Sequence, residues 1–570
     1  MIPNNEQEEF INSQGNVVLQ ACPGSGKTTS VALKYQKLLL NWKQKHSGIA
    51  LLSFTNIASK ELENKIKKDC HIENGVNYPH YIGTLDSFFD MILLRFGYLI
   101  YKKRPITIIS NQIDGLGWEA SCYKKSCNQE INTFRFQKDG KLLKNNVEVK
   151  SYCENTPLCC ERNLKILINN GIITQANVPY CLYNLLLKFP ILVKCIKARY
   201  PVIFIDEAQD TSKEQMDIID IFVDNGIVVN LIGDPDQAIY EWRNANVSGF
   251  VEKFSMSNWS HLKLKTNRRS SQLICNATKP FSMLLSSEKE YISTAENKDC
   301  SIKPILLIYN INDKEKPIKW FLNKCEEENI DINNTAIVQR AQINNNLKIK
   351  NMWSDCKMTE YLARASYDWF SGNRKNVWNY CDKVTYLILE GDIKKYNKDV
   401  IKDKVYGTNN LTFDNVVKAV VNCISSPLLT LEKWFISTKD KLQKFFDSNG
   451  INQDINKIFK MKTRDKNYPN FKQEFLYRYF ETTKQEKYFY STIHGVKGFT
   501  FDALMLVIKS IKGNTITPTV LLSNDKNSEY SRMVYVAMTR PRKLLVVATP
   551  KGKFDYEKVF NKNDWDIIES

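Results

Sequence analysis

The sequence predicts an α/β fold of two parallel-sheet domains, each interrupted by a mostly helical insertion. Short apolar runs that resemble buried strands alternate with helical patterns in two separate stretches of the chain. Such alternation is typical of parallel sheets, because each parallel connection needs a crossover helix. Two other stretches have helical spacing and little strand signal, so we predict that they are insertions. The length of 570 residues also exceeds that of one compact domain, which has about 100–200 residues.

The apolar runs set the limits of these predicted domains. The runs of the first domain are residues 16–21, 48–54, 202–205 and 227–232, and those of the second are 305–308, 335–338, 503–507 and 544–548. The predicted parts are 1–90 with 196–265 for the first domain, 91–195 for its insertion, 266–345 with 484–570 for the second domain, and 346–483 for its insertion.

Composition indicates a soluble cytoplasmic protein with a polyanionic partner. Lys and Arg number 80 against 62 Asp and Glu, a formal net charge of +18. This excess is compatible with nucleic-acid binding, although a general richness in Lys, Asn and Ile would also produce it. The sequence has no apolar run of about 18–20 residues that could span a membrane, and no signal-peptide pattern. Fifteen scattered cysteines, an odd number, favour reduced thiols.

A phosphate-binding loop is predicted at Ala21-Cys-Pro-Gly-Ser-Gly-Lys-Thr28. It follows an apolar strand and precedes a helix, so that backbone N–H groups and the helix dipole point at a phosphate. Gly24 and Gly26 allow close approach of the backbone, Lys27 can reach the β- and γ-phosphates, and the Thr28 hydroxyl can ligate Mg²⁺. The alternative is a chance Gly-Lys-Thr before a helix, and Ala21 stands where the motif usually has glycine.

A pair of carboxylates supplies the rest of an ATP site. Asp206 and Glu207 follow the apolar strand 202–205, which places Asp206 near the Mg²⁺ and Glu207 where it can orient or deprotonate water. An acidic pair at a solvated strand end is the alternative. We therefore expect ATP and Mg²⁺ as cofactors.

Three further motifs carry a family resemblance. They are Asp206-Glu-Ala-Gln-Asp-Thr211, Gly233-Asp-Pro-Asp-Gln-Ala-Ile-Tyr240 and Val534-Tyr-Val-Ala-Met-Thr-Arg-Pro-Arg542. With the phosphate loop, they resemble the motifs of superfamily 1 helicases of the UvrD/PcrA/Rep group. The resemblance implies two RecA-like P-loop domains and ATP-driven 3′–5′ translocation on single-stranded DNA with strand separation.

The same resemblance implies roles around the nucleotide. Gln7 resembles the glutamine that reads adenine, Gln237 the γ-phosphate sensor, and Arg269 and Arg540 the two arginines that the second domain directs at the γ-phosphate. The set implied as nucleotide-binding or catalytic is Gln7, Ala21, Gly24, Ser25, Gly26, Lys27, Thr28, Thr29, Asp206, Glu207, Gln237, Arg268, Arg269 and Arg540, with Thr28 and Asp206 as metal ligands.

A second implied set contacts DNA. Phe54 and Trp242 resemble aromatics that stack on bases, which holds a strand without reading its sequence; taken alone, either ring could equally be core packing. The set implied is Phe54, Thr55, Asn56, Thr84, Tyr240, Trp242, Arg243, Thr492, His494 and Lys497.

Three positions depart from the family pattern. Arg268 replaces a tyrosine that stacks on adenine, which leaves base selectivity open. Thr500 replaces a glutamate and weakens an expected ribose contact. Asp86 replaces a histidine, and an acid near a DNA path would repel phosphate unless it is paired.

The overall form also resembles the helicase-like subunits of Gabija anti-phage systems, whose other subunit is an OLD-family nuclease (GajA-like). We therefore predict a helicase or translocase that binds single-stranded DNA and junctions, and the resemblance implies such a nuclease as its partner in a hetero-oligomer. The alternative is an NTPase that senses DNA ends or single strands and regulates a nuclease with little unwinding. A scaffold without catalysis is disfavoured because the catalytic residues are present.

Two further patterns are weaker. Cys122, Cys127, Cys153, Cys159 and Cys160 lie close in sequence but lack a C-x₂-C pair, so ordinary thiols are favoured over a metal site. Residues 457–490 mix basic and aromatic side chains, which suits either a binding face or a solvated helical insertion.

Overall fold

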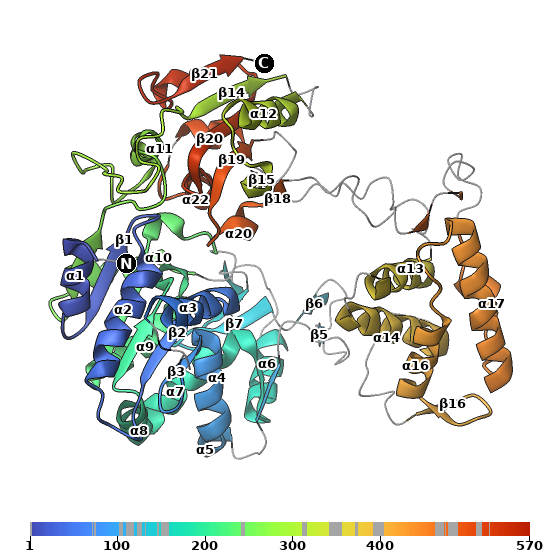
Figure 1. Ribbon diagram of the computed structural model, residues 1–570. Coiled ribbons are helices and arrows are strands. Elements are labelled where there is room, and N and C mark those ends of the chain that lie inside the picture. Colours follow the sequence, from blue (N-terminus) through green and yellow to red (C-terminus); the bar gives the residue numbers. More distant parts are fainter. Residues whose placement is uncertain are drawn as a thin grey trace. The chain divides into compact units, whose positions relative to one another are not determined.

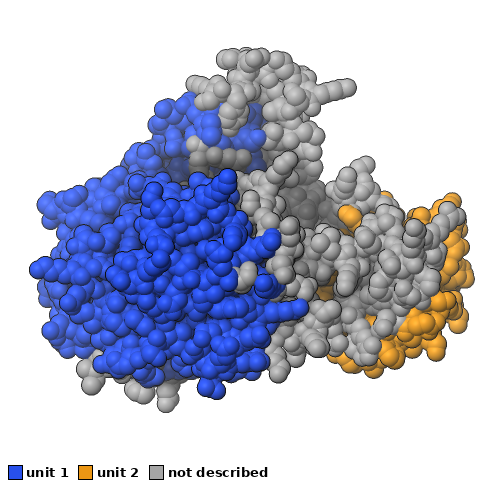
Figure 2. Space-filling model, turned by 90° about the horizontal axis from the view of Figure 1, so that it is seen from above, with its two compact units in different colours: residues 1–111, 119–342, 488–570 blue, residues 112–118, 343–487 orange. Residues whose placement is uncertain are grey.

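The computed structural model contains two six-stranded parallel sheets, some smaller sheets and a group of helices (Figure 1). The residues it describes are 3–70, 72, 76–101, 106–109, 119–121, 128–130, 133–144, 147–149, 159–240, 245–310, 316–340, 356–370, 374–390, 404–461, 472–473, 475–476, 488–508, 516–523 and 525–569. The chain divides into two compact units (Figure 2): residues 1–111, 119–342 and 488–570 form unit 1, and residues 112–118 and 343–487 form unit 2. Both parallel sheets lie in unit 1.

The first sheet has the strand order β13-β1-β12-β11-β2-β3, with every pairing parallel. Its strands are β1 (Val17–Ala21), β2 (Ile49–Ser53), β3 (Tyr81–Thr84), β11 (Val202–Ile205), β12 (Val228–Gly233) and β13 (Ser260–Leu264). Its helices include α1 (Asn5–Asn12), α2 (Lys27–Leu40), α3 (Asn56–Asp69), α4 (Leu85–Phe96), α9 (Lys213–Asp224) and α10 (Val247–Glu252). All residues of β1 and β2 are buried, which is why these strands read as continuous apolar runs rather than alternating ones.

The second sheet has the order β18-β15-β19-β20-β14-β21 and is also entirely parallel. Its strands are β14 (Ile305–Tyr309), β15 (Thr335–Gln339), β18 (Phe489–Thr492), β19 (Phe501–Val507), β20 (Pro541–Pro550) and β21 (Asp566–Glu569). The helices around it include α11 (Gln272–Thr278), α12 (Lys316–Glu327), α20 (Ile493–Val496), α21 (Pro518–Ser523) and α22 (Glu529–Met538). The predicted α/β fold with two parallel sheets is confirmed.

The segment between β3 and β11 contains short strands as well as helices. The helices after α4 are α5 (Tyr98–Tyr101), α6 (Cys159–Asn169), α7 (Val178–Lys188) and α8 (Ile191–Arg199). The strands are β4 (Thr107–Ile109), β5 (Glu119–Ser121), β6 (Asn128–Glu130), β7 (Phe134–Phe136), β8 (Leu142–Lys144), β9 (Val147–Glu148) and β10 (Ile172–Thr174). Strands of two or three residues are too short to show a period-2 pattern, so the sequence suggested mainly helices.

Unit 2 is mostly helical in its described part. Its helices are α13 (Lys357–Phe370), α14 (Arg374–Glu390), α16 (Phe413–Cys423), α17 (Leu431–Asn449) and α18 (Ile455–Ile458), with a small hairpin of β16 (Val405–Tyr406) and β17 (Leu411–Thr412). Trp434 is fully buried in this core, and its indole N–H donates to the Ser366 hydroxyl at 2.9 Å. The buried Trp therefore has the polar partner that its ring requires.

No helix formed by the described residues is long and apolar enough to cross a membrane.

Lys34 is a buried lysine on α2 that predicts a pH-dependent stability. Its ammonium group donates to Ser13 Oγ at 2.8 Å and to Asn230 Oδ1 at 2.9 Å, and it pairs with no carboxylate of the described residues. Burial, followed by the charge of Lys37, lowers its pKa from 10.5 to about 7. Between these values the unfolded chain binds a proton that the folded chain lacks, so the free energy of unfolding rises with pH by at most about 1.4 kcal/mol per unit.

We expect Lys34→Met to lose this slope in urea denaturation at pH 7, 7.5 and 8, a range that ends below the ordinary thiol pKa of about 8.5. The exposed Lys43→Met is the matched control and should keep the slope. Equal slopes in the parental protein and Lys34→Met would show that Lys34 stays charged in the fold.

Candidate nucleotide and DNA site

The predicted phosphate loop joins the end of β1 to the start of α2, at the carboxyl end of the first sheet. Gly24 and Gly26 have φ angles of 74° and 84°, which lie in the left-handed region that favours glycine. A Cβ atom on Gly24 would also lie 2.8 Å from the Cβ atom of Arg269. The loop therefore needs glycine for its conformation and for its contact with the second domain.

Lys27 and Gln7 face this loop. The Lys27 ammonium is buried and forms no hydrogen bond in the described structure; it makes only an ion pair of 3.9 Å with Glu207. Gln7 is 1% exposed, and its Nε2 donates to the Ser25 carbonyl at 3.2 Å. An ammonium with three unused donors beside helix-terminal N–H groups fits a bound triphosphate.

Asp206 and Glu207 reach the loop because β11 and β1 flank the same strand, β12. Glu207 has a φ of 56°, a strained conformation for a non-glycine residue that is often found at functional sites. Burial and then the charge of Glu207 raise the pKa of Asp206, and a divalent cation would restore its ionised form. Burial alone would raise the pKa of Glu207, but the ammonium groups of Lys27 and Lys497 outweigh it and lower that pKa.

Two arginines of the second domain lie at the same place. Arg540 is 2% exposed and donates from Nη2 to Gln237 Oε1 at 2.6 Å. Arg269 donates to the carbonyl of Thr539, next to Arg540, at 3.0 Å. Burial and then the charge of Arg269 lower the pKa of Arg540 to about 9. Two buried guanidinium groups that disfavour each other's charge would gain from an anion between them.

The segment before Arg269 holds the back of the phosphate loop. The backbone N–H of Arg268 donates to the Gly24 carbonyl at 2.9 Å. The Asn267 amide and the Tyr291 hydroxyl both donate to the Pro23 carbonyl, at 3.1 and 3.2 Å. The structure therefore brings the nucleotide residues predicted from both domains together around one loop.

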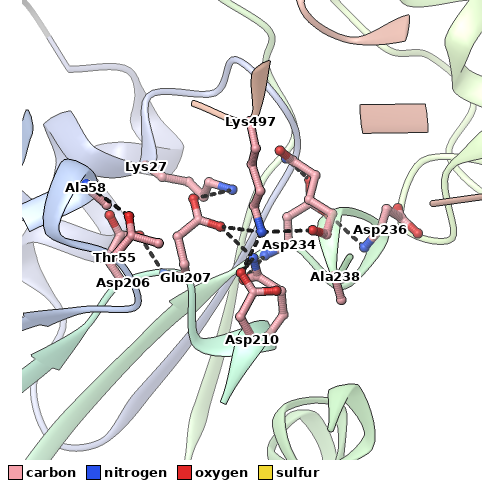
Figure 3. A network of polar contacts seen from close by, with 12 residues as sticks. Lys27, Thr55, Ala58, Asp206, Glu207, Asp210, Asp234, Asp236, Ala238 and Lys497 are labelled. Atoms are coloured by element: carbon pink, nitrogen blue, oxygen red, sulfur yellow. Dashed lines mark hydrogen bonds and ion pairs between the residues drawn. The ribbon is translucent and has the colours of Figure 1, made fainter. Parts of the chain in front are cut away.

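Lys497, which the resemblance assigns to DNA, pairs with two carboxylates of the first domain. Its ammonium points between Glu207 and Asp210 (Figure 3), at 3.6 Å from the first carboxylate and 2.5 Å from the second. Burial would lower its pKa, but these carboxylates outweigh that effect and raise it. With its side chain 9% exposed and its charge paired inside, Lys497 is not presented to a DNA backbone in this structure, and its DNA contact stays a prediction.

Comparison with known proteins agrees with this geometry. Residues 3–256 match the model of the UvrD/REP helicase N-terminal domain. Most of the first sheet lies within this match, and the two parallel-sheet domains correspond to the two RecA-like domains of such helicases.

Individual relatives match a larger part of this chain than the family model does. The Gabija protein GajB of Bacillus cereus is 23% identical over 98% of this chain and 97% of its own length. The ATP-dependent DNA helicase Rep of Buchnera aphidicola is 23% identical over 94% of this chain and 92% of its own. The ATP-dependent DNA helicase PcrA of Staphylococcus epidermidis is 25% identical over 48% of this chain and 39% of its own. The predicted resemblance is confirmed.

The threonines expected to contact DNA are also helix caps. Thr55 accepts from Ala58 N at 3.2 Å, Thr84 from Ser87 N at 3.1 Å, and Thr492 from Gly495 N at 3.2 Å. Thr55 comes just after β2, whereas Thr84 and Thr492 end β3 and β18, and each is the N-cap of the next helix. Capping alone explains these threonines, so their DNA contacts stay predictions.

The predicted ring residues form a row of tilted ring contacts that joins the two RecA-like domains. The Phe54 ring lies 5.3 Å from that of Tyr240, and the Tyr240 ring lies 5.6 Å from that of His494. Asn56 starts α3 and is exposed. These residues are close enough to act on one strand, and their role in DNA binding stays a prediction.

Several predictions fall wholly or partly outside the described residues. Trp242, Arg243 and three of the five clustered cysteines lie there, as does most of 457–490. Cys22 and Cys181 are free thiols, and no group of metal-binding side chains occurs among the described residues. Asp86, the suspect acid, accepts a hydrogen bond of 2.7 Å from Gln215, so it has the partner that its position required.

Sequence reasoning missed Asp210, Asp236 and Arg532. Asp210 binds Lys497; Asp236 is buried and accepts from the Ser282 hydroxyl at 2.6 Å; and Arg532, 4% exposed, donates to the Ala238 carbonyl at 2.7 Å. Asp210 and Asp236 lie inside the motifs quoted above. Their acidic side chains in these motifs were the signal that could have identified them. Arg532 precedes its motif by two residues, and a lone arginine on a helical pattern predicts only a solvated face.

Proposed function

We propose that the chain is an ATP-dependent superfamily 1 DNA helicase or translocase that moves 3′–5′ on single-stranded DNA. The observation that carries the proposal is the contact between Arg540 of the second RecA-like domain and Gln237 of the first, 2.6 Å long and beside the phosphate loop. A nucleotide bound there touches both domains, so its arrival and hydrolysis can change their separation. A motor needs a nucleotide site of this kind, between two domains that can move relative to each other.

The residues have distinct tasks in this reaction. Lys27 and the N–H groups of the phosphate loop bind and orient the triphosphate. Thr28 and Asp206 would hold Mg²⁺, which neutralises charge on the phosphates. Glu207 accepts a proton from the attacking water, while Arg269 and Arg540 neutralise the charge that develops on the γ-phosphate. Gln7 and Arg268 contact the loop and are assigned to the adenine side.

The protein partner is proposed from the similarity of nearly the whole chain to a Gabija protein. The Gabija protein GajB matches nearly the whole sequence, which supports a helicase subunit that acts with an OLD-family nuclease in a cytoplasmic anti-phage complex. Single-stranded DNA and junctions are the proposed nucleic-acid partners. The net charge of +18 supports a polyanionic ligand.

A second candidate function is a DNA-sensing NTPase that regulates the nuclease with little unwinding. The Arg268 and Thr500 departures favour it, because they alter expected nucleotide and strand contacts. Two assays on the purified chain separate the candidates: ATP hydrolysis with and without single-stranded DNA, and strand displacement on duplexes with 3′ or 5′ tails. Displacement from the 3′ tail supports the motor, DNA-stimulated hydrolysis without displacement supports the sensor, and neither activity contradicts both.

Single-strand binding should depend on Trp242. If Trp242 is a stacking platform, Trp242→Ala weakens affinity for single-stranded DNA by about 1–3 kcal/mol, with little dependence on sequence. Fluorescence anisotropy with labelled oligonucleotides measures this, and affinity should also fall with salt because bound phosphates release counterions. The buried Trp434→Phe in unit 2 is the control. Unchanged affinity in a folded Trp242→Ala protein would assign Trp242 to the core.

A further inference from the structure

The loop Gln237–Tyr240, here called the sensor loop, is held by side chains of the second RecA-like domain along three consecutive residues. The backbone carbonyls of Gln237, Ala238 and Ile239 each lie within hydrogen-bond distance of one such side chain. The donors, in the same order, are Lys497 Nζ at 3.0 Å, Arg532 Nε at 2.7 Å and His494 Nε2 at 3.0 Å. The third contact requires the proton of His494 to be on Nε2.

Arg532 is the central donor and is buried. Besides Ala238, it donates from Nη1 to the Asn527 carbonyl at 2.8 Å, so its guanidinium joins the sensor loop to the turn before α22. The planar group is well suited to this, since it offers several donors in a fixed geometry. The same helix ends two residues before Arg540, so α22 carries the contact to the loop backbone and leads directly to the contact with Gln237.

The two ends of the sensor loop face different ligands. At one end, the Gln237 side chain accepts from Arg540 beside the phosphate loop. At the other, the Tyr240 ring stacks near Phe54 and His494, where the proposed DNA strand passes. A movement of Gln237 can be transmitted to Tyr240 only if the backbone between them stays rigid. Ala238 lies in this part of the sensor loop.

We propose that Arg532 is a positioning residue that couples nucleotide binding to DNA binding by fixing the sensor loop at Ala238. The proposal rests on the proposed function, because it assigns to the loop the two ligands named there. The Arg532 guanidinium donates to the carbonyls of Ala238, Lys526 and Asn527, so we assign its effect to the sensor loop rather than to the reacting atoms. Without its guanidinium, the loop can shift at one end while the other stays in place.

The direct test is the effect of a non-hydrolysable ATP analogue on the affinity for single-stranded DNA. Coupling between two sites typically changes an affinity by about 5- to 150-fold. We expect a change of this size in the parental protein and a change close to onefold in Arg532→Met, with each ligand's separate affinity kept within about threefold. Arg532→Lys retains one donor and should show intermediate coupling.

A matched control separates coupling from folding. Lys253 is equally buried and pairs with Asp220 of α9 at 2.5 Å, without a contact to the sensor loop. Lys253→Met should therefore keep the coupling even if its stability falls. Parental coupling in Arg532→Met would overturn the proposal, since a merely structural arginine would change stability and leave the ratio of affinities unchanged.

Hydrogen–deuterium exchange tests whether Arg532 holds the sensor loop, without relying on a DNA response. The backbone N–H groups of Gln237 and Ala238 donate to the carbonyls of Asp234 and Pro235, within the turn that leads into the sensor loop. We expect these amides to exchange at least about tenfold faster in Arg532→Met, as a local opening becomes easier, and at the parental rate in Lys253→Met. If the parental protein shows no coupling between nucleotide and DNA binding, the proposed function fails. Unchanged amide exchange in Arg532→Met would show that Arg532 does not hold the sensor loop, whether or not the parental protein shows coupling.

Discussion

Arg540→Ala should abolish ATP hydrolysis while ATP binding remains within a few-fold of the parental value. Arg540 donates to Gln237 at 2.6 Å and is 2% exposed, so its charge lies in the cleft where the γ-phosphate is proposed to bind. An arginine that neutralises transition-state charge contributes about 10³–10⁵ to the rate of phosphoryl transfer. Steady-state hydrolysis and equilibrium binding of a fluorescent ATP analogue measure the two effects separately.

Two variants sharpen this experiment. Arg540→Lys should rescue hydrolysis poorly, because an ammonium lacks the planar fork that contacts Gln237 and a phosphate together. Arg542→Ala removes an arginine two residues away whose side chain is 50% exposed and pairs with Asp502, and hydrolysis should stay at the parental rate. Normal DNA-stimulated turnover in Arg540→Ala would contradict both the cleft assignment and the motor.

Glu207→Gln should bind ATP normally and hydrolyse it about 10²–10⁴ times more slowly. The amide has the size of the carboxylate and can keep the left-handed backbone of residue 207, so the pocket keeps its shape. What is lost is the group that accepts the proton of the attacking water. Single-turnover hydrolysis with saturating enzyme measures this step without a contribution from binding.

A buried carboxylate elsewhere in unit 1 provides the matched control. Glu214 on α9 is 6% exposed and pairs with Arg135 rather than with the phosphate loop. Glu214→Gln should reduce stability, because it removes the charge that pairs with Arg135, and should leave the rate of hydrolysis unchanged. Parental hydrolysis in Glu207→Gln would show that another group accepts the proton.

The nucleotide half of the site was accessible from the sequence because its signals are local. The strand before Ala21, the glycines at 24 and 26 and the acidic pair after β11 each follow from a few adjacent residues. Buried parallel strands are recognisable as short apolar runs, and a parallel sheet aligns their carboxyl ends at one edge. The loop and the carboxylates were therefore predictable as neighbours, and the contact of 3.9 Å between Lys27 and Glu207 agrees with this.

Family resemblance carried the prediction further than local pattern. Arg540 and Gln237 are 303 residues apart, and no periodicity or spacing relates them. The motifs placed them in one cleft, and the structure has them in contact. Their roles in hydrolysis remain to be measured with the variants above.

The direction of the long cationic side chains was decided only by the tertiary structure. Lys497 stands in a motif that resembles a DNA contact, yet its ammonium lies between Asp210 and Glu207. Arg532 has the helical spacing of a solvated face, yet it is buried against Ala238. A flexible side chain of this length can reach several partners, and the one that it binds depends on which carboxylates and carbonyls the second domain meets when it packs on the first. The sequence by itself determined the strands and the phosphate loop and predicted the residues of the reaction, whereas the packing of the two RecA-like domains determined how their charges are paired.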